Sequence, residues 1–181
     1  MRAFLGIPIP DNLKSKVIGI QDRFSDFDIK FVESENLHFN IKFFKEIENE
    51  KVKKYKEILE KISTQFEPFE IEISGLGAFP SKNYIRVIWL GVKQGYQIFR
   101  SLTETIENSL EALGAEREDR FIPHLTLGRV RSGRNKNELL ILIRKLEDVE
   151  IGKMKIDKIT LFQSKLSPKG PIYEEVFTIN F

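Results

Sequence analysis

Residues 123–127, PHLTL, have a counterpart in residues 37–41, LHFNI, and each stretch contains one of the two histidines of this chain of 181 residues. In both stretches the histidine is followed by an apolar, a hydrogen-bonding and another apolar residue. Because side chains of a β-strand alternate between its faces, the histidine and the hydrogen-bonding residue are expected to share one face. The two stretches therefore predict two strands, each presenting a histidine and a polar side chain on the same side.

This pairing suits acid–base chemistry on a phosphate. Imidazole is the side chain whose unperturbed pKa allows it both to give and to take a proton near neutral pH, so His38 and His124 together offer an acid and a base. Asn40 and Thr126, two residues further along, are candidates to hold phosphate oxygens. A single histidine in an apolar strand is more often a packing or surface residue than a catalyst, but two in matching settings favour a functional site.

The two histidines lie 86 residues apart, close to half the length of the chain, which indicates an internal duplication. A second pair supports it, because residues 4–7, FLGI, resemble residues 89–92, WLGV, at an offset of 85. In each half, one apolar periodicity typical of a helix precedes the histidine strand and another follows it. The predicted helices are marked by the apolar positions from Leu13 to Phe24, Val52 to Phe66, Phe99 to Leu113, and Leu139 to Leu146.

Strand-like runs close each half, at residues 71–78 and 84–90 in the first and at residues 151–162 and 172–179 in the second. The run 84–90 fits either the end of the first repeat or the start of the second, so strands could cross between the two lobes. Mixed helices and strands in this order predict an α+β protein, either one domain or two small lobes that share an interface.

Composition agrees with a compact protein that has a real core, since 41% of the residues are hydrophobic. No apolar run approaches the roughly 18 residues of a membrane helix, and Met1 to Phe4 lacks the features of a signal peptide. A cytoplasmic protein without membrane contact is therefore expected. The absence of cysteine excludes disulfides, a thiol nucleophile and thiolate metal sites.

The net charge of +2 is too small to identify a nucleic-acid binder, but basic residues gather near both histidines. Such clusters favour a phosphate-bearing ligand, although each residue singly is more often a solvated surface charge. Arg129 has the wrong parity for the face of His124 on an ideal strand and reaches it only if a bulge or strand end intervenes. The basic residues are Lys42 and Lys45 after the first histidine, and Arg117, Arg120, Arg129, Arg131, Arg134 and Lys136 around the second.

Five stretches in a fixed order resemble the 2H phosphoesterases, which are named for two HxT or HxS motifs, and within them the RNA 2′,3′-cyclic phosphodiesterases, also called 2′-5′ RNA ligases. The resemblance implies a single bilobal domain over residues 1–181, with two antiparallel sheets facing a central cleft and helices outside. The stretches are MRAF at residues 1–4, residues 35–43, GAFP at 77–80 followed by Arg86 and Trp89, HLTLGR at 124–129, and SPKGPIY at 167–173.

The resemblance also implies a reaction. RNA with 2′,3′-cyclic phosphate ends, tRNA fragments among them, and small nucleotides are the expected substrates, cleaved to 2′-phosphates without a metal or cofactor, with 2′-5′ joining as a minor activity. A monomer is expected. We interpret His38 as the acid and His124 as the base, with Thr126 and Asn40 on the phosphate oxygens and Arg129 as a further helper. The sequence leaves the order of the two histidine roles open.

Other assignments follow from the same pattern. Lys42 is predicted to bind substrate, and Phe79 or Tyr173 to stack on a base or ribose, although an aromatic residue at such a turn more often only packs. Asn40 departs from the family pattern, which has Thr or Ser there. A non-catalytic RNA-end or nucleotide-binding module is therefore the main alternative. A metal-dependent hydrolase is weaker, because no closely spaced ligand motif accompanies the histidines.

Overall fold

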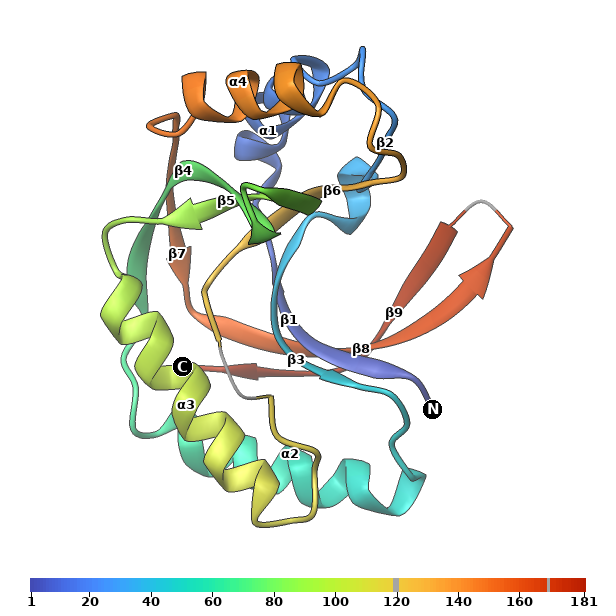
Figure 1. Ribbon diagram of the computed structural model, residues 1–181. Helices are drawn as coiled ribbons and strands as arrows, with labels where there is room; N and C mark the ends of the chain where they lie inside the picture. Colours follow the sequence, from blue (N-terminus) through green and yellow to red (C-terminus); the bar gives the residue numbers. More distant parts are fainter. Residues whose placement is uncertain (119–120, 169) are drawn as a thin grey trace.

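The computed structural model describes residues 1–118, 121–168 and 170–181, which form four α-helices and nine strands (Figure 1). All four helices coincide with the predicted apolar periodicities. The helices are α1 (Asp11–Asp22), α2 (Asn49–Ser63), α3 (Tyr96–Glu111) and α4 (Lys136–Lys145). The strands are β1 (Ala3–Pro8), β2 (Ile29–Phe31), β3 (His38–Phe44), β4 (Phe69–Ser81), β5 (Tyr84–Val92), β6 (Leu125–Val130), β7 (Glu150–Ile156), β8 (Lys158–Ser167) and β9 (Gly170–Asn180).

The strands pair antiparallel in the order β7-β4-β5-β6-β3-β1-β8-β9, and β2 adds to β6. One group of strands consists of β7, β4, β5, β6 and β2, and the other of β3, β1, β8 and β9. The two groups meet where β3 pairs with β6 through one residue pair, Phe39 with Leu125. Figure 1 shows α1 and α4 at one end of the molecule and α2 and α3 at the other. The predicted α+β class is confirmed, and the two predicted sheets are continuous through this junction, which places the two histidine strands side by side.

The run 151–162, predicted as one strand, consists of the end of β7 and the start of β8. The chain changes partners at Asp157, because β7 pairs with β4 whereas β8 pairs with β1 and β9. The carbonyl of Asp157 accepts a hydrogen bond from Phe181 N at 2.8 Å, outside the regular ladders. The strand β5 pairs with β4 of its own half and β6 of the other, so strands do cross between the halves.

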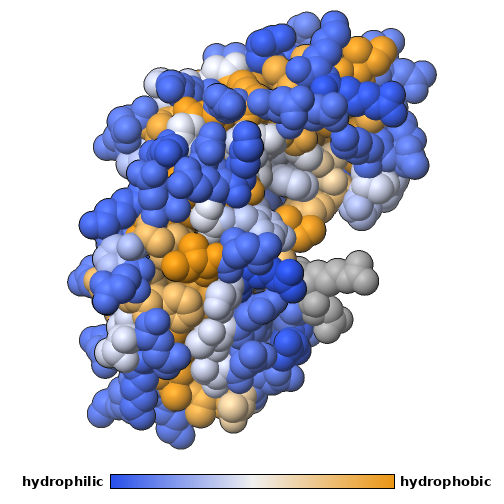
Figure 2. Space-filling view, turned by 90° about the vertical axis from the view of Figure 1, so that its left-hand side faces the viewer, coloured by the Kyte–Doolittle hydropathy of each residue, from blue (hydrophilic) through white to orange (hydrophobic). Residues whose placement is uncertain are grey.

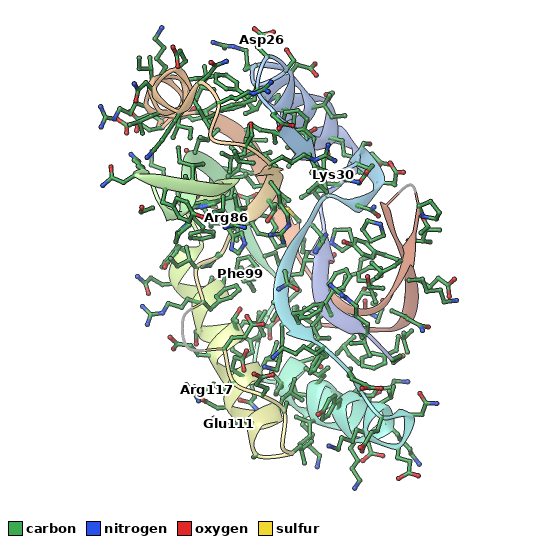
Figure 3. The ribbon with its side chains drawn as sticks, turned by 45° about the vertical axis from the view of Figure 1, so that its right-hand side comes forward. Asp26, Lys30, Arg86, Phe99, Glu111 and Arg117 are labelled. Atoms are coloured by element: carbon green, nitrogen blue, oxygen red, sulfur yellow. The ribbon has the colours of Figure 1, made fainter. Side chains whose placement is uncertain are left out.

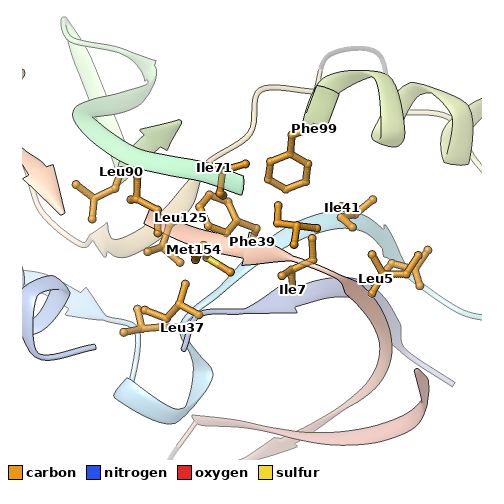
Figure 4. Close-up of a cluster of buried hydrophobic side chains, with 14 of the residues drawn as sticks. Leu5, Ile7, Leu37, Phe39, Ile41, Ile71, Leu90, Phe99, Leu125 and Met154 are labelled. Carbon is orange, nitrogen blue, oxygen red and sulfur yellow. The ribbon is translucent and has the colours of Figure 1, made fainter. Parts of the chain in front are cut away.

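The core lies between the sheet and the helices (Figure 4). Phe39 and Leu125, which join the two groups of strands, are fully buried, and Phe99 of α3 packs edge-on against Phe39 with ring centroids 5.5 Å apart. Burial of such side chains contributes roughly 1.5–3 kcal/mol each. Because the backs of both histidine strands are fixed in this way, their opposite faces are held in place for a site.

The surface shown in Figure 2 is largely hydrophilic, with smaller groups of hydrophobic side chains between the polar ones. This agrees with a chain in which 31% of the residues are charged. In the part of the chain that the structure describes, no helix is long and apolar enough to cross a membrane.

Candidate active site

Each histidine strand has a register shift a few residues after its histidine. On β3, Asn40 pairs with Gly6 and Lys42 pairs with Leu5, so Ile41 is an extra residue in the ladder. On β6, Leu127 is the extra residue opposite β5. These two residues lie 86 positions apart, at the same offset as the histidines. The duplication therefore extends to the irregularities of the strands.

A bulge reverses the alternation of side chains beyond it. On β6 the register shift turns Arg129 to the face of His124 and Thr126. The sequence alone predicts that Arg129 reaches the site only through such a bulge. On β3 the equivalent residue is Phe43, at the same offset of 86. Both Arg129 and Phe43 line one cleft together with the two histidines.

The same bulge removes Lys42 from the cleft. Its side chain is 1% exposed, and its Nζ donates to Glu107 Oε1 at 2.9 Å, to Glu107 Oε2 at 2.8 Å and to the carbonyl of Glu116 at 2.6 Å. The prediction that Lys42 binds substrate is therefore wrong. Simple strand alternation placed it on the face of His38, but the extra residue Ile41 directs it toward α3.

The histidine cleft, as we call the space lined by both histidines, has a volume of about 460 Å³. It contains Asn40, Thr126, Arg129 and Tyr173 of the predicted residues. Among the described residues, neither the Asn40 amide nor the Thr126 hydroxyl forms a hydrogen bond, so both are available to a ligand. The other lining residues are Arg2, Phe4, Lys30, Phe31, Val32, Glu33, Asn36, Phe43, Ser164, Leu166 and Pro171.

Both histidines are held by a backbone carbonyl two residues earlier. His38 Nδ1 lies 2.6 Å from the carbonyl oxygen of Asn36, and His124 Nδ1 lies 2.7 Å from that of Ile122. Because a carbonyl oxygen only accepts, each Nδ1 must carry a proton and donate it. The Nε2 atom of each ring is then the nitrogen that remains for proton transfer.

An aromatic pair braces each ring. The Phe4 ring lies 4.5 Å from the His38 ring, centroid to centroid, and Tyr173 meets the same ring edge-on at 5.4 Å. The His124 ring has Phe79 edge-on at 4.9 Å and Trp89 at 6.1 Å. Phe79 also stacks on Trp89 and is not among the described lining residues of the cleft, which favours a packing role for it. Tyr173 does line the cleft, and its stacking on a substrate stays a prediction.

Burial lowers the pKa of His38 below its ordinary value, and the charge of His124 lowers it further, against the opposing effect of the Asn36 carbonyl. Burial also lowers the pKa of His124, and Arg129 acts in the same direction. Burial and Glu33 raise the pKa of Tyr173. Both imidazoles are thus biased toward the neutral form in the free protein, and an anionic phosphate between them would favour protonation.

Sequence reasoning missed two basic residues of the cleft, Arg2 and Lys30. The guanidinium of Arg2 lies over the Phe43 ring, 4.9 Å from its centroid, and both residues line the cleft. Lys30, on β2, lies directly opposite Arg129 in the β2–β6 ladder. Only the pairing of β1 and β2 with the histidine strands brings these cations in, and no local motif marks either of them.

The remaining basic residues near the histidines have other surroundings. Lys45 pairs with Glu116 at 3.0 Å and Arg117 pairs with Glu111 at 2.6 Å, both at the surface. Arg120 lies outside the described residues. Within the described ranges, no three histidine, aspartate or glutamate side chains cluster in a way that could hold a metal ion.

Comparison with known proteins identifies relatives of this arrangement. The sequence pattern of the family described as LigT like Phosphoesterase matches twice, over residues 7–89 and 90–173, one match for each half. An RNA 2′,3′-cyclic phosphodiesterase of Methanothermobacter thermautotrophicus is 39% identical over 178 residues, which are 97% of this chain and 96% of that protein. An RNA 2′,3′-cyclic phosphodiesterase of Methanocaldococcus jannaschii is 41% identical, with coverage of 97% and 98%.

Solved structures show the same fold. A crystal structure of a Thermus thermophilus protein superimposes with a TM-score of 0.84 at 23% identity, covering 99% of this chain and 97% of that one. Escherichia coli LigT complexed with 3′-AMP gives a TM-score of 0.81 at 21% identity, with coverage of 99% and 97%. The arrangement of a sheet with helices at both ends is therefore shared at low sequence identity.

Proposed function

The chain belongs to the LigT-like 2H phosphoesterases, the family of RNA 2′,3′-cyclic phosphodiesterases, and we propose that it hydrolyses 2′,3′-cyclic phosphate ends of RNA to 2′-phosphate ends by two-histidine acid–base catalysis. The expectation that it is an enzyme of this family is confirmed by relatives that share 39% and 41% of their residues with it. One observation carries the mechanism. Both histidines line one cleft, and each is held through Nδ1 so that Nε2 is left to react.

The reaction needs one proton taken and one proton given. Neutral His124 accepts a proton from water through Nε2 as the water oxygen forms a bond to phosphorus. The bond from phosphorus to the ribose 3′ oxygen breaks, and His38, protonated at Nε2, gives its proton to that oxygen. Burial lowers the pKa of both rings, and the charge of Arg129 lowers that of His124 further, which suits His124 as the neutral base.

Polar groups in the cleft would stabilise the charge on phosphorus. The hydroxyl of Thr126 and the amide of Asn40 face the cleft from equivalent positions of β6 and β3, where each could donate to a non-bridging oxygen. Arg2, Lys30 and Arg129 bring positive charge to the same space. We propose that these groups replace the role that a metal ion has in other phosphoesterases.

The test is turnover of an oligoribonucleotide that ends in a 2′,3′-cyclic phosphate, measured after exhaustive chelation and without nucleoside triphosphate. We expect hydrolysis to persist and phosphorus NMR to show the product phosphate on the 2′ oxygen. A 3′-phosphate product would contradict the assignment of His38 as the acid for the 3′ leaving group. Activity lost under EDTA and restored by a divalent ion would replace this mechanism with a metal-dependent one.

Finer points belong to the same proposal. We propose that tRNA fragments and small nucleotides with cyclic phosphates are substrates, that 2′-5′ ligation is a minor reverse activity, and that the protein acts as a monomer in the cytoplasm. Turnover of each substrate, the 2′-5′ linkage of any joined product, and light scattering of the protein in solution check these points.

Asn40 favours a second candidate function, a binding module for RNA ends. Its planar amide can donate to a phosphate oxygen but cannot rotate as a hydroxyl does, so binding could persist while turnover falls. A protein that binds a 2′-nucleotide in calorimetry and shows no turnover of the cyclic phosphate would support this candidate over the enzyme.

A further inference from the structure

A second cationic hollow lies beyond the end of β6. We call it the edge hollow, and it has a volume of about 350 Å³. Three of its lining residues are basic: Arg86 on β5, Arg131 after β6, and Lys136 at the start of α4. Its other lining residues are Tyr84, Ile85, Val130, Ser132, Gly133 and Leu139.

The three basic side chains have no acidic partner within the described part of the chain. No carboxylate of the described residues forms an ion pair with Arg86, Arg131 or Lys136, whereas other basic side chains of the surface do have such partners. Arg86 is held in place, because its Nη1 donates to the Tyr84 hydroxyl at 2.8 Å and its guanidinium lies 5.7 Å from the centre of the Tyr84 ring. Uncompensated positive charge on a held side chain is suited to an anion.

A buried hydroxyl points to the same kind of ligand. The Oγ atom of Ser132 is buried and has no hydrogen-bond partner among the residues that the structure describes. Buried polar atoms without a partner are rare in folded proteins and call for an explanation such as a missing ligand or water. Rotation of the Ser132 side chain toward the hollow would let this hydroxyl donate to a phosphate oxygen bound there.

The edge hollow and the histidine cleft are separate cavities, and consecutive residues at the end of β6 reach both of them. Arg129 lines the cleft and Arg131 lines the hollow, so their Cα atoms are about 7 Å apart on an extended chain. This is comparable with the separation of neighbouring phosphates in an extended single strand. Arg86 and Lys30, both labelled in Figure 3, lie on two strands that pair with β6.

We propose that the edge hollow binds a backbone phosphate of the RNA chain upstream of the cyclic phosphate end, so that oligoribonucleotides are bound in preference to mononucleotides. The inference rests on the proposed function for its substrate, since the reacting end must occupy the histidine cleft while the chain leaves past Arg129. A mononucleoside cyclic phosphate has no upstream phosphate and gains nothing from the hollow.

The test separates the hollow from the catalytic cleft. Arg86→Ala, Arg131→Ala and Lys136→Ala should each raise KM for an oligoribonucleotide cyclic phosphate by roughly fivefold, as for an exposed charge pair, and leave turnover of a mononucleoside cyclic phosphate unchanged. Arg144→Ala is the matched control, because Arg144 is an exposed basic residue near the other end of α4. The dependence of affinity on salt should also weaken, by a slope of about 0.7 for each phosphate that a variant no longer neutralises.

A binding experiment keeps the test independent of catalysis. An oligoribonucleotide that ends in a 2′-phosphate should bind the three variants more weakly than wild type and the Arg144 variant, as measured by fluorescence anisotropy. Equal affinities and equal salt slopes for all five proteins would contradict phosphate binding in the edge hollow, whether or not the wild type hydrolyses a cyclic phosphate. Failure of wild type to hydrolyse any cyclic phosphate, with the binding difference intact, would instead overturn only the proposed function.

Discussion

The two histidine strands, β3 and β6, have the same local structure around the histidine but carry their charged side chains on different faces. In both, a carbonyl two residues earlier holds Nδ1, an aromatic pair contacts the ring and a bulge follows the histidine. At the bulge, however, β3 directs the lysine Lys42 behind the sheet and the apolar Phe43 into the cleft. The equivalent residues of β6 are Gly128 behind the sheet and Arg129 in the cleft.

This difference follows from what covers each strand. Behind β3, Lys42 finds Glu107 of α3 as a buried partner. At Gly128 the backbone of β2 passes so close that an added Cβ would lie 2.9 Å from the carbonyl oxygen of Lys30. The two duplicated strands thus share their histidine–carbonyl hydrogen bonds and their bulges. The charged side chains on them differ because the neighbouring elements differ. The second strand carries a cation, Arg129, on the cleft side, whereas the cation of the first strand, Lys42, lies behind the sheet.

Removal of either histidine tests this shared local structure and should have the largest effect. His38→Ala and His124→Ala should each lower kcat/KM for cyclic phosphate hydrolysis by about 10²–10⁴, the usual contribution of a general acid or base. The double variant should be little worse than the weaker single variant, because the two groups act in one step. Circular dichroism should show an intact fold, and turnover near that of wild type in either single variant would contradict the mechanism.

Lys42 tests the difference behind the strands. Its replacement by Met leaves the Glu107 carboxylate buried without its partner, which should lower the free energy of unfolding by about 3–5 kcal/mol in urea titrations. The matched control is Lys45→Met, since the Lys45 side chain is 76% exposed in its ion pair and should contribute at most about 1 kcal/mol.

Joint replacement sharpens the result. The double variant Lys42→Met/Glu107→Leu should recover part of the stability, because no charge is then left buried without a partner. Equal losses in the Lys42 and Lys45 single variants would show that the buried pair contributes no more than the exposed one.

The sequence predicted the parts of this fold that depend on local patterns. Four helices followed from apolar periodicity, and the matching of the two histidines followed from a short repeat. The resemblance predicted Arg129 as a site residue, on the condition that a bulge turns it to the face of His124. The position of Lys42 behind the sheet could not be predicted, because a single extra residue in a strand reverses the faces and leaves no compositional mark at Ile41 or Leu127. The contributions of Arg2 and Lys30 depend on which strands pair, and pairing is a property of the whole fold.

Asn40 tests the polar positions that line the cleft from equivalent sites of β3 and β6. Asn40→Ala removes a donor to the phosphate and should cost about 1.5–3 kcal/mol of transition-state stabilisation, or about one to two decades in kcat/KM. Asn40→Thr makes β3 resemble β6 and should preserve or raise activity, because a β-branched residue with a hydroxyl suits this strand position. Kinetics and calorimetry on both variants check this, and an Ala variant equal to wild type in turnover and binding would show that Asn40 does not contact the phosphate.

Arg129 tests the charge difference directly, with the smallest expected effect. Since its charge lowers the pKa of His124, Arg129→Gln should move the titration of His124 to higher pH, toward the ordinary value for histidine, while His38 moves less. The sign follows because loss of a nearby cation makes the imidazolium easier to form. Proton NMR of the ring signals can follow both groups, because the chain has only two histidines and each alanine variant assigns the other. Arg131→Gln, two residues along the chain and lining the edge hollow, is the control and should leave His124 unchanged. A titration of His124 that stays in place or moves to lower pH in Arg129→Gln would mean that burial alone keeps this ring neutral, and the reason for choosing His124 as the base would be lost.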